Sequence, residues 1–251
     1  MTARTLVIGG SGGIGSEVVR RFAPDGAVVF TYLKAVGPAT RLVEALGAEG
    51  FDVEAHQLDV RDVDALEAIV GKAGPDIRTV VFAAASGVQR PLVDVRSKHC
   101  DWTYQTNQRA FILLYKFALA SLRANRGSLV ALTSVGSRRV LPDYALVGAT
   151  KAALEAIVRY AACEAAPWGV RVNSVCPGLV ETKALNSFPE INLRLRATMG
   201  ATPLGRLVTP REVAETVHWI SSDAAGMITG HNLVVDGGWE VGNAIGAAPP
   251  S

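Results

Sequence analysis

The sequence predicts a single α/β domain in which a parallel sheet of seven strands is covered by helices on both faces. Short β-branched and apolar runs alternate with amphipathic helical stretches along the chain. A glycine-rich segment directly follows the first of these runs. No internal repeat or low-complexity linker divides the 251 residues. We therefore expect one domain over residues 1–245 and a loosely docked tail over 246–251.

The strand candidates are short runs of residues that favour extended structure. Right-handed crossovers between parallel strands place ligands at the carboxyl ends of the strands, near the point where strand order reverses. We therefore expect functional residues just after strands. In chain order, the predicted strands are Thr5–Ile8, Ala27–Thr31, Val53–Leu58, Thr79–Ala83, Ser128–Leu132, Arg171–Val175 and Leu233–Val235.

The composition favours a small-molecule partner. The 25 basic and 23 acidic residues are spread along the chain and give a formal net charge of +2, so no block of like charge indicates nucleic-acid or membrane-surface binding. No run of 18 apolar residues exists, and strand-like residues begin at Thr5, which leaves no room for a signal peptide. We expect a cytoplasmic protein. The apolar fraction of 49% suggests that other subunits cover some helix surface.

Neither the cysteines nor the histidines are spaced as metal ligands. Cys100, Cys163 and Cys176 are far apart and include no Cys-x-x-Cys pair, so we expect reduced, mostly buried thiols. The four histidines are isolated from one another. The sequence therefore predicts no metal site.

The segment Gly9-Gly10-Ser11-Gly12-Gly13-Ile14-Gly15 joins the first predicted strand to an amphipathic helix. Glycines let the backbone turn tightly and approach a pyrophosphate, whose charge is stabilised by the free amide groups of the helix N-terminus. Within alternating strands and helices, this segment predicts a doubly wound Rossmann domain that binds a dinucleotide. The candidate contacts are Gly9, Ser11, Gly13, Ile14 and Gly15.

The spacing of Gly9, Gly13 and Gly15 resembles the glycine pattern of the short-chain dehydrogenase/reductase superfamily, and the resemblance extends to Val235-Asp236-Gly237-Gly238. It implies a nicotinamide-dependent oxidoreductase. It also implies that Asp59 and Val60 contact the adenine, that Ala84 lies in a turn where the family's asparagines are lost, and that Asn107 matches the family's helix asparagine. The segment Cys176–Thr182 resembles the turn beside the nicotinamide, which implies contacts from Pro177, Gly178, Val180 and Thr182.

Cofactor choice depends on the end of the second strand, where a carboxylate would hold the ribose hydroxyls of NAD and repel a 2′-phosphate. This chain has Thr31-Tyr32-Leu33-Lys34 there, without a carboxylate. Lys34 offers a positive charge to the phosphate, so NADPH is favoured over NADH. Many NADPH-dependent relatives carry an arginine in the glycine loop where this chain has Gly12, so the preference depends on few charges. A solvated Lys34 is the alternative.

The catalytic candidates follow the fifth strand. Mainstream members of the superfamily use a serine, a tyrosine and a lysine together, with the tyrosine four residues before the lysine. Lys151 is present, but the tyrosine position holds Val147, and the nearest upstream tyrosine is Tyr144. Seven residues make nearly two helical turns, so Tyr144 and Lys151 are expected on one helix face. Ser134 keeps the family's spacing to the lysine.

Moving the tyrosine back by three residues shifts it about 4.5 Å along a helix axis. In ketone reduction, negative charge appears on the oxygen next to the carbon that accepts hydride. In enoyl-thioester reduction it appears several bonds away, so a stabilising group must lie further out. The Tyr144–Lys151 spacing resembles that of divergent enoyl-acyl-carrier-protein reductases, and further segments resemble the NADPH-dependent bacterial type III enzyme. The resemblance implies that Lys151 binds the nicotinamide ribose and that Tyr144 hydrogen-bonds the thioester oxygen.

The stretch 184–204 mixes apolar and charged residues between prolines and predicts a substrate lid, with ordinary packing as the alternative. Arg194, Arg196 and Arg206 are candidates to meet the phosphate of a carrier-protein or coenzyme A arm, although solvated arginines are more common.

We therefore predict NADPH-dependent reduction of the 2,3 double bond of an enoyl thioester, on acyl carrier protein or coenzyme A, in fatty-acid or polyketide-type biosynthesis. The alternative is a ketoreductase or alcohol dehydrogenase of the same fold, which Ser134 supports and Val147 opposes. A third possibility is a regulator that binds NADPH without turnover, against which the retained Tyr144, Lys151 and Asn107 argue. The family resemblance also implies a homotetramer formed through the helices after strands four and five.

Overall fold

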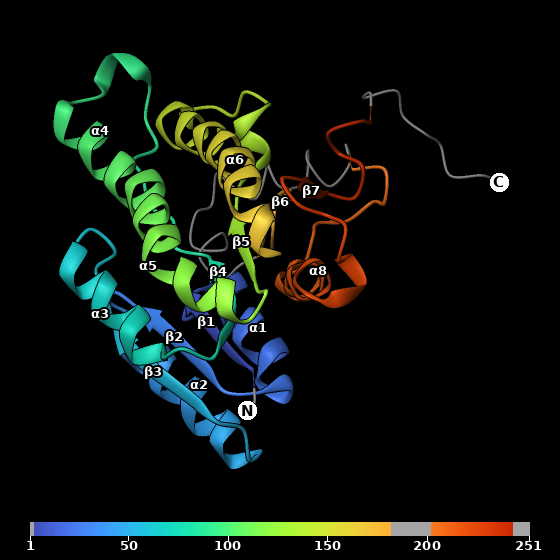
Figure 1. Cartoon of the computed structure of the whole chain (residues 1–251). Coiled ribbons are helices and arrows are strands. Elements are labelled where there is room, and N and C mark those ends of the chain that lie inside the picture. The colour runs from blue at the N-terminus through green and yellow to red at the C-terminus, as the bar shows by residue number, and fades with distance from the viewer. Residues whose placement is uncertain (1–2, 182–201, 243–251) are drawn as a thin grey trace.

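The structure is a computed structural model that describes residues 3–181 and 202–242. A seven-stranded sheet forms its centre, in the order β3-β2-β1-β4-β5-β6-β7, and every neighbouring pair is parallel. Strand order reverses between β1 and β4, which is where a doubly wound sheet binds its ligand. The predicted Rossmann architecture is confirmed (Figure 1).

The strands form where the sequence predicts them, with ends that differ by one or two residues. The shortest strand, β7, lies at one edge of the sheet. Two strands extend two residues beyond the prediction: β4 begins at Ile77, and β6 continues to Pro177, where its last residues pair with β7. The observed strands are β1 (Arg4–Ile8), β2 (Val28–Tyr32), β3 (Val53–Gln57), β4 (Ile77–Phe82), β5 (Ser128–Leu132), β6 (Arg171–Pro177) and β7 (Asn232–Val235).

Helices cover both faces of the sheet, and each buries an apolar stripe against it. On one face lie α1 (Gly13–Phe22), α2 (Val36–Ala48) and α8 (Pro210–Ser221). On the other lie α3 (Val63–Ala73), α5 (Ala110–Ala124) and α6 (Ala145–Ala165). The short α4 (Ser97–Tyr104) runs into α5 through a π-helical turn, Gln105–Arg109.

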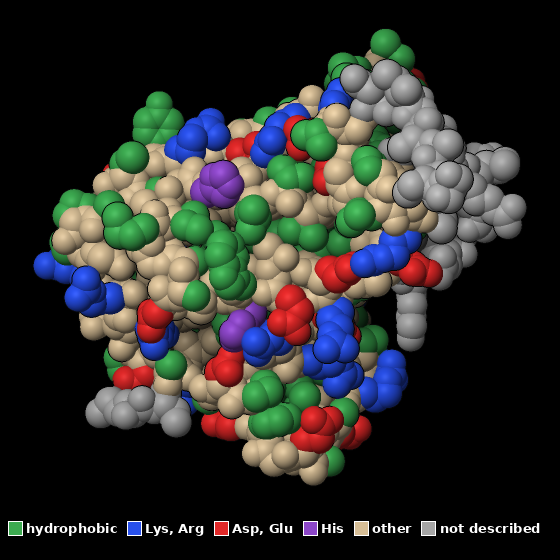
Figure 2. Space-filling model, turned by 90° about the vertical axis from the view of Figure 1, so that its right-hand side faces the viewer, with side chains coloured by type: hydrophobic (Ala, Val, Ile, Leu, Met, Phe, Trp, Pro, Cys, Tyr) green, Lys and Arg blue, Asp and Glu red, His purple; other side chains and the backbone are tan. Residues whose placement is uncertain are grey.

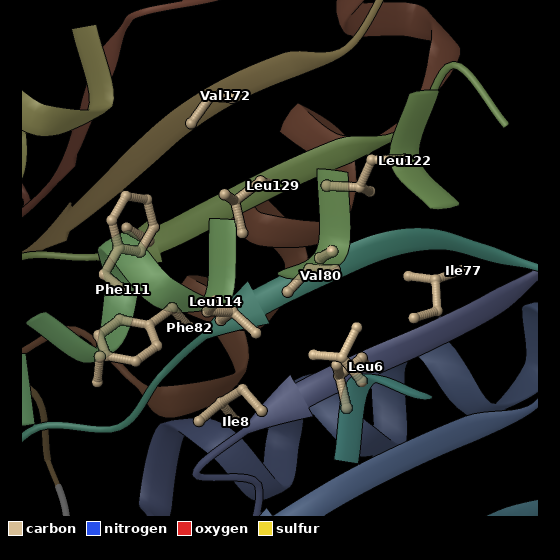
Figure 3. Close-up of a cluster of buried hydrophobic side chains, with 14 of the residues drawn as sticks. Leu6, Ile8, Ile77, Val80, Phe82, Phe111, Leu114, Leu122, Leu129 and Val172 are labelled. Atoms are coloured by element: carbon tan, nitrogen blue, oxygen red, sulfur yellow. The ribbon is translucent and has the colours of Figure 1, made fainter. Parts of the chain in front are cut away.

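The core between the sheet and α5 consists of large apolar side chains that are completely buried. Phe82 of β4 meets Phe111 of α5 edge to face, with 5.6 Å between ring centroids. Figure 3 shows this pair beside the aliphatic residues of β1, β4, β5 and β6. Such packing holds the sheet rigid, so that the loops at the carboxyl ends of its strands are positioned by a fixed frame. The other labelled members are Leu6, Ile8, Ile77, Val80, Leu114, Leu122, Leu129 and Val172.

Acidic and basic side chains are interspersed on the face that carries α8 and β7, as Figure 2 shows. Several of them are paired, including Arg206 with Glu212 on α8 and Arg21 with Glu215. In the described part of the chain, no helix is long and apolar enough to cross a membrane. The same residues contain no group of three or more His, Cys, Asp or Glu side chains arranged to hold a metal ion.

One prediction about the cysteines is wrong. Cys176 is buried at the end of β6, whereas Cys100 on α4 and Cys163 on α6 are exposed, because they lie on the outer sides of their helices. The predicted tail at 246–251 and most of the predicted lid at 184–204, with Arg194 and Arg196, lie outside the described residues. Arg206 is described, and its guanidinium binds Glu212 at the start of α8.

Candidate active site

The glycine loop brings the first strand, the first helix and the turn after β4 into close contact. Gly9 has a φ of +90°, and a Cβ there would lie 2.7 Å from the backbone nitrogen of Ala84. A Cβ on Gly15 would lie 2.1 Å from the carbonyl oxygen of Gly9. Any side chain at either position would therefore push the loop open. Gly13 and Ile14 form the first turn of α1, whose free amide groups face the loop and suit a pyrophosphate.

A cavity of about 220 Å³ lies beside this loop at the carboxyl ends of β2, β3 and β4. Asp59 and Val60 line it, as does Ala84, so three of the predicted cofactor contacts meet in one place. The Asp59 carboxylate is held by the Arg61 side chain, and this hydrogen bond lowers the Asp59 pKa below its ordinary value. The cavity lies on the β1–β2–β3 side of the strand reversal, where the adenosine half of a dinucleotide binds.

A wider cleft of about 1200 Å³ extends from the glycine loop between α1, α2 and the start of α8. Ser11 lines it together with Arg20 of α1, Arg41 of α2 and Arg211 of α8. Three glutamates also line this cleft, so its charge is mixed. Lys34 is exposed in the turn after β2 and lines neither space.

Lys151 carries its amino group into the interior at the end of β5. The side chain is 3% exposed, and Nζ donates a hydrogen bond of 2.7 Å to the carbonyl oxygen of Leu132. Burial disfavours the ammonium form and lowers the Lys151 pKa to about 8. The residue therefore titrates within the pH range in which an enzyme operates.

The sequence predicts Tyr144 and Lys151 on one face of a helix, and this prediction is wrong for Tyr144, which caps α6 while the helix begins at Ala145. Its hydroxyl is 3.4 Å from the Ser134 hydroxyl, which follows β5. Burial raises the pKa of the phenol, so Tyr144 remains a hydrogen-bond donor at neutral pH. A Cβ on Gly136 would lie 2.5 Å from the Tyr144 ring, so the absence of a side chain at position 136 makes room for it.

Val147 occupies the position four residues before Lys151 and is buried. A Cβ on Gly87 would lie 2.3 Å from the Val147 side chain, so the loop after β4 packs directly against this valine. The position where mainstream relatives carry a tyrosine is therefore filled by apolar packing, and the phenol that contacts Ser134 comes from Tyr144, three residues earlier at the helix cap.

Asn107 lies in the π-helical turn between α4 and α5 and is completely buried. Its amide oxygen accepts a hydrogen bond from the Ser86 backbone nitrogen at 3.0 Å. Its amide nitrogen donates to the Ser86 carbonyl at 2.8 Å and to the Thr150 hydroxyl at 2.9 Å. Asn107 thus connects the turn after β4 to the residue before Lys151, and the widened π turn aims it there.

Comparison with known proteins shows which family the chain belongs to. A protein-family profile described as "Enoyl-(Acyl carrier protein) reductase" matches residues 9–240. The chain belongs to the short-chain dehydrogenase/reductase superfamily. It is 36% identical to 1-cyclohexenylcarbonyl-CoA reductase from Streptomyces collinus over 98% of this chain and 88% of that protein. It is 31% identical to bovine L-xylulose reductase over 94% of this chain and 96% of that protein.

Solved structures of this superfamily superpose on the whole domain. A short-chain dehydrogenase/reductase from Serratia marcescens gives a TM-score of 0.87 at 28% identity and covers 94% of this chain and 97% of its own. A short-chain type dehydrogenase/reductase from Mycobacterium ulcerans gives a TM-score of 0.86 at 27% identity and covers 96% of this chain and 90% of its own. This short-chain dehydrogenase/reductase is therefore an oxidoreductase, and its fold binds NAD(P)H.

The turn after β6 lies at the same edge of the sheet as Ser134 and Lys151 of this reductase. Pro177 ends the strand, and a Cβ on Gly178 would lie 2.8 Å from the Asp236 side chain. Val180 forms a single bridge with Val208. Thr182, the predicted carboxamide contact, lies outside the described residues.

Sequence reasoning missed a partly buried network that supports the loop after Ser134. Ser137 donates a hydrogen bond of 2.5 Å to the Glu155 carboxylate on α6, and Arg138 lies between Glu155 and Glu240. These residues join the loop after β5, α6 and the segment after β7. The spacing of Arg138, Glu155 and Glu240 along the chain does not predict these ion pairs, because the fold of the sheet brings the three residues together.

Proposed function

We propose that this reductase transfers hydride from NADPH to the 2,3 double bond of an enoyl thioester. The observation that carries the proposal is the position of the phenol. Val147 fills the mainstream tyrosine position, and Tyr144 presents its hydroxyl to Ser134 from the turn before α6. A hydroxyl displaced from the mainstream tyrosine position suits an oxyanion that forms away from the carbon that accepts hydride.

The nicotinamide supplies the hydride when it is bound. In the proposed reaction, Tyr144 donates a hydrogen bond to the thioester oxygen as the enolate forms. Ser134, whose hydroxyl lies 3.4 Å from the Tyr144 hydroxyl, assists. Lys151 reaches the end of β5, where its amino group would hold the nicotinamide ribose. Asn107 keeps the turn after β4 and the start of α6 in register.

The substrate is proposed to be a coenzyme A or acyl-carrier-protein thioester. The name of the Streptomyces relative specifies a coenzyme A thioester, and in a 1-cyclohexenylcarbonyl group the ring double bond is conjugated to the carbonyl. The chain is 36% identical to this relative and 31% identical to L-xylulose reductase, which favours a thioester over a free sugar. We place the activity in fatty-acid or polyketide-type biosynthesis.

NADPH is the proposed cofactor because no carboxylate follows β2. Tyr32 and Leu33 occupy the end of that strand, and Lys34 is free to approach a 2′-phosphate from the exposed turn. Arg41 lines the cleft beside Ser11 and adds a second positive charge on this side of the glycine loop. Sequence reasoning missed Arg41 because its position near the glycine loop depends on how α2 packs against the sheet.

The proposal is tested by following NADPH oxidation at 340 nm with crotonyl-CoA and with acetoacetyl-CoA. We expect turnover of the enoyl substrate. Tyr144→Phe should lower kcat by about 10²–10³, the usual cost of one oxyanion donor. Tyr160→Phe, on the exposed side of α6, is the matched control and should behave as the parent. Turnover of the keto substrate alone would overturn the proposal.

Carbonyl reduction is the second candidate, and the Ser134–Tyr144 hydrogen bond favours it. A serine and a tyrosine that share a proton can stabilise the alkoxide formed next to the hydride acceptor. Some relatives are named for carbonyl substrates, such as 2-keto-3-deoxy-L-fuconate dehydrogenase from Xanthomonas campestris, 31% identical over 94% of this chain and 79% of that protein. In this case Ser134→Ala should abolish turnover of acetoacetyl-CoA.

A further inference from the structure

Arg61 lies just after β3 and is held in place from two sides. Its guanidinium makes a two-pronged contact with Asp59, with Nε 2.9 Å from Oδ1 and a terminal nitrogen 2.5 Å from Oδ2. Its carbonyl oxygen accepts a hydrogen bond of 2.6 Å from the Arg109 guanidinium. The planar group is therefore fixed before any ligand arrives, and its charge is balanced by the carboxylate.

Trp102 of α4 lies against this guanidinium. The central carbon of the Arg61 guanidinium is 4.3 Å from the centroid of the indole ring, a cation–π distance. The indole nitrogen donates a hydrogen bond of 3.0 Å to the Ser86 hydroxyl, in the turn after β4. Residues from three separate segments thus form one continuous wall, which we call the Arg61–Trp102 strap.

The strap borders the 220 Å³ cavity at the carboxyl ends of β2, β3 and β4, and Arg61, Trp102 and Ser86 all line that cavity. Trp102 remains 39% exposed, so a large aromatic surface is available beside an open space. The arginine is neutralised by Asp59, so this wall suits an uncharged flat ring better than a phosphate.

We propose that the adenine ring of the cofactor packs against the Arg61–Trp102 strap, which is a major determinant of affinity for the adenosine half. The inference rests on the proposed nicotinamide cofactor. It places the recognition of this half in Arg61, which follows β3, and in Trp102 on α4. Ser86 connects the strap to Asn107, because the Ser86 backbone forms two hydrogen bonds with the Asn107 amide.

The test measures binding of two halves of the cofactor by calorimetry, with ADP-ribose for the adenosine half and reduced nicotinamide mononucleotide for the other. Trp102→Leu and Arg61→Ala should each weaken ADP-ribose about tenfold, within the range that stacking of one base contributes. Binding of the mononucleotide should change less than about twofold, because its site lies on the other side of the strand reversal. Trp102→Phe, which keeps an aromatic ring, should recover most of the affinity.

The chain supplies a matched control pair. Arg123, at the end of α5, lies 4.9 Å from the ring of Trp168, in the turn after α6. Both residues precede strands, so they lie near the amino ends of the strands, away from the cavity. Arg123→Ala and Trp168→Leu remove the same kind of contact and should leave ADP-ribose binding unchanged. Equal ADP-ribose affinity in Trp102→Leu and Trp168→Leu would overturn the proposed role of the strap. Equal weakening of ADP-ribose binding and mononucleotide binding by Trp102→Leu would also overturn it. A parent protein that binds neither NADPH nor ADP-ribose would overturn the cofactor assignment itself.

Discussion

Lys151 is the residue whose chemistry depends most on the folded structure. An exposed lysine is charged throughout the physiological range, whereas this one is enclosed at the end of β5 and has a pKa of about 8. Tyr144 shifts the other way, since burial raises its pKa. The two groups are therefore protonated together only below about pH 8. Neither shift is visible in the spacing of the residues along the chain.

We predict that kcat/KM for NADPH-dependent turnover falls as the pH rises above about 8, because Lys151 then loses the charge that holds the cofactor. The measurement is a pH–rate profile between pH 6 and pH 10 (about two units either side of the Lys151 pKa). Tyr144 does not account for such a fall, because its pKa lies above the ordinary value of 10.0. A flat profile across this range would contradict the assignment.

Stability gives an independent check on the same residue. The folded pKa of Lys151 is below its ordinary value of 10.5, so the native state binds fewer protons than the unfolded chain between about pH 8 and pH 10.5. The stability contributed by this site therefore rises with pH across that window, and the cost of burying the ammonium is fully present below it. Lys151→Met should raise the free energy of unfolding most at about pH 7. The difference in free energy of unfolding between this variant and the parent should shrink by about pH 10, because the parent lysine is then largely neutral in the folded state.

At the scale of elements, the start of α8 is the best-defined helix terminus in the structure. Thr209 caps the helix, and its side chain accepts a hydrogen bond from the Glu212 backbone nitrogen, while the Glu212 carboxylate accepts one from the Thr209 nitrogen at 2.9 Å. Arg206 binds the same carboxylate and, with this cap, lowers the Glu212 pKa to about 2. The cap matters to the site because α8 borders the wide cleft beside the glycine loop.

We predict that Thr209→Ala lowers the free energy of unfolding by about 1 kcal/mol, the usual cost of removing such a cap. Thr216→Ala is the control, because it removes the same hydroxyl from the helix interior, where alanine is favoured. Urea denaturation at neutral pH measures both. Equal effects of the two substitutions would argue against the cap.

The charge of Glu212 adds a pH dependence to this terminus. Because its folded pKa is depressed, its stabilising contribution is present above the ordinary value of 4.5 and is lost as the pH falls toward about 2. The difference in stability between the parent and Glu212→Gln should therefore diminish over that range.

At the scale of the whole molecule, the sheet divides the chain into two functional halves. The glycine loop and the ends of β2 and β3 line the cavity proposed for the adenosine half. Ser134, Tyr144 and Lys151 lie at the end of β5. The helices after β4 and β5 keep apolar side chains at their surface, among them Ile112 on α5 and Tyr160 on α6. We propose that these helices join four copies of the chain.

The assembly is tested by sedimentation equilibrium at micromolar concentration. We expect four times the mass of the chain for the parent and smaller species for Ile112→Glu, which places a charge in the proposed interface. Val36→Glu is the control, because Val36 is similarly exposed on α2, on the opposite face of the sheet. A strict monomer for the parent would contradict the proposal.

The sequence by itself determined the order of strands and helices, the parallel sheet and the glycine loop, because each depends on periodicity or on backbone freedom within a few residues. Gly9 and Gly15 are necessary at a turn that the sequence alone locates. Lys151, Tyr144 and Ser134 were also found from their spacing, and the structure brings their side chains to the end of β5. Their catalytic roles remain proposals.

Only the tertiary structure decided what surrounds those residues. Arg61 meets Trp102, and Glu155 and Glu240 meet Arg138, across distances in the chain that no local pattern spans. The two exposed cysteines and the placement of Tyr144 before the first turn of α6 were likewise settled by packing. The physical reason is that secondary structure follows from neighbours in sequence, whereas burial, pKa and side-chain contacts follow from which elements the sheet places side by side.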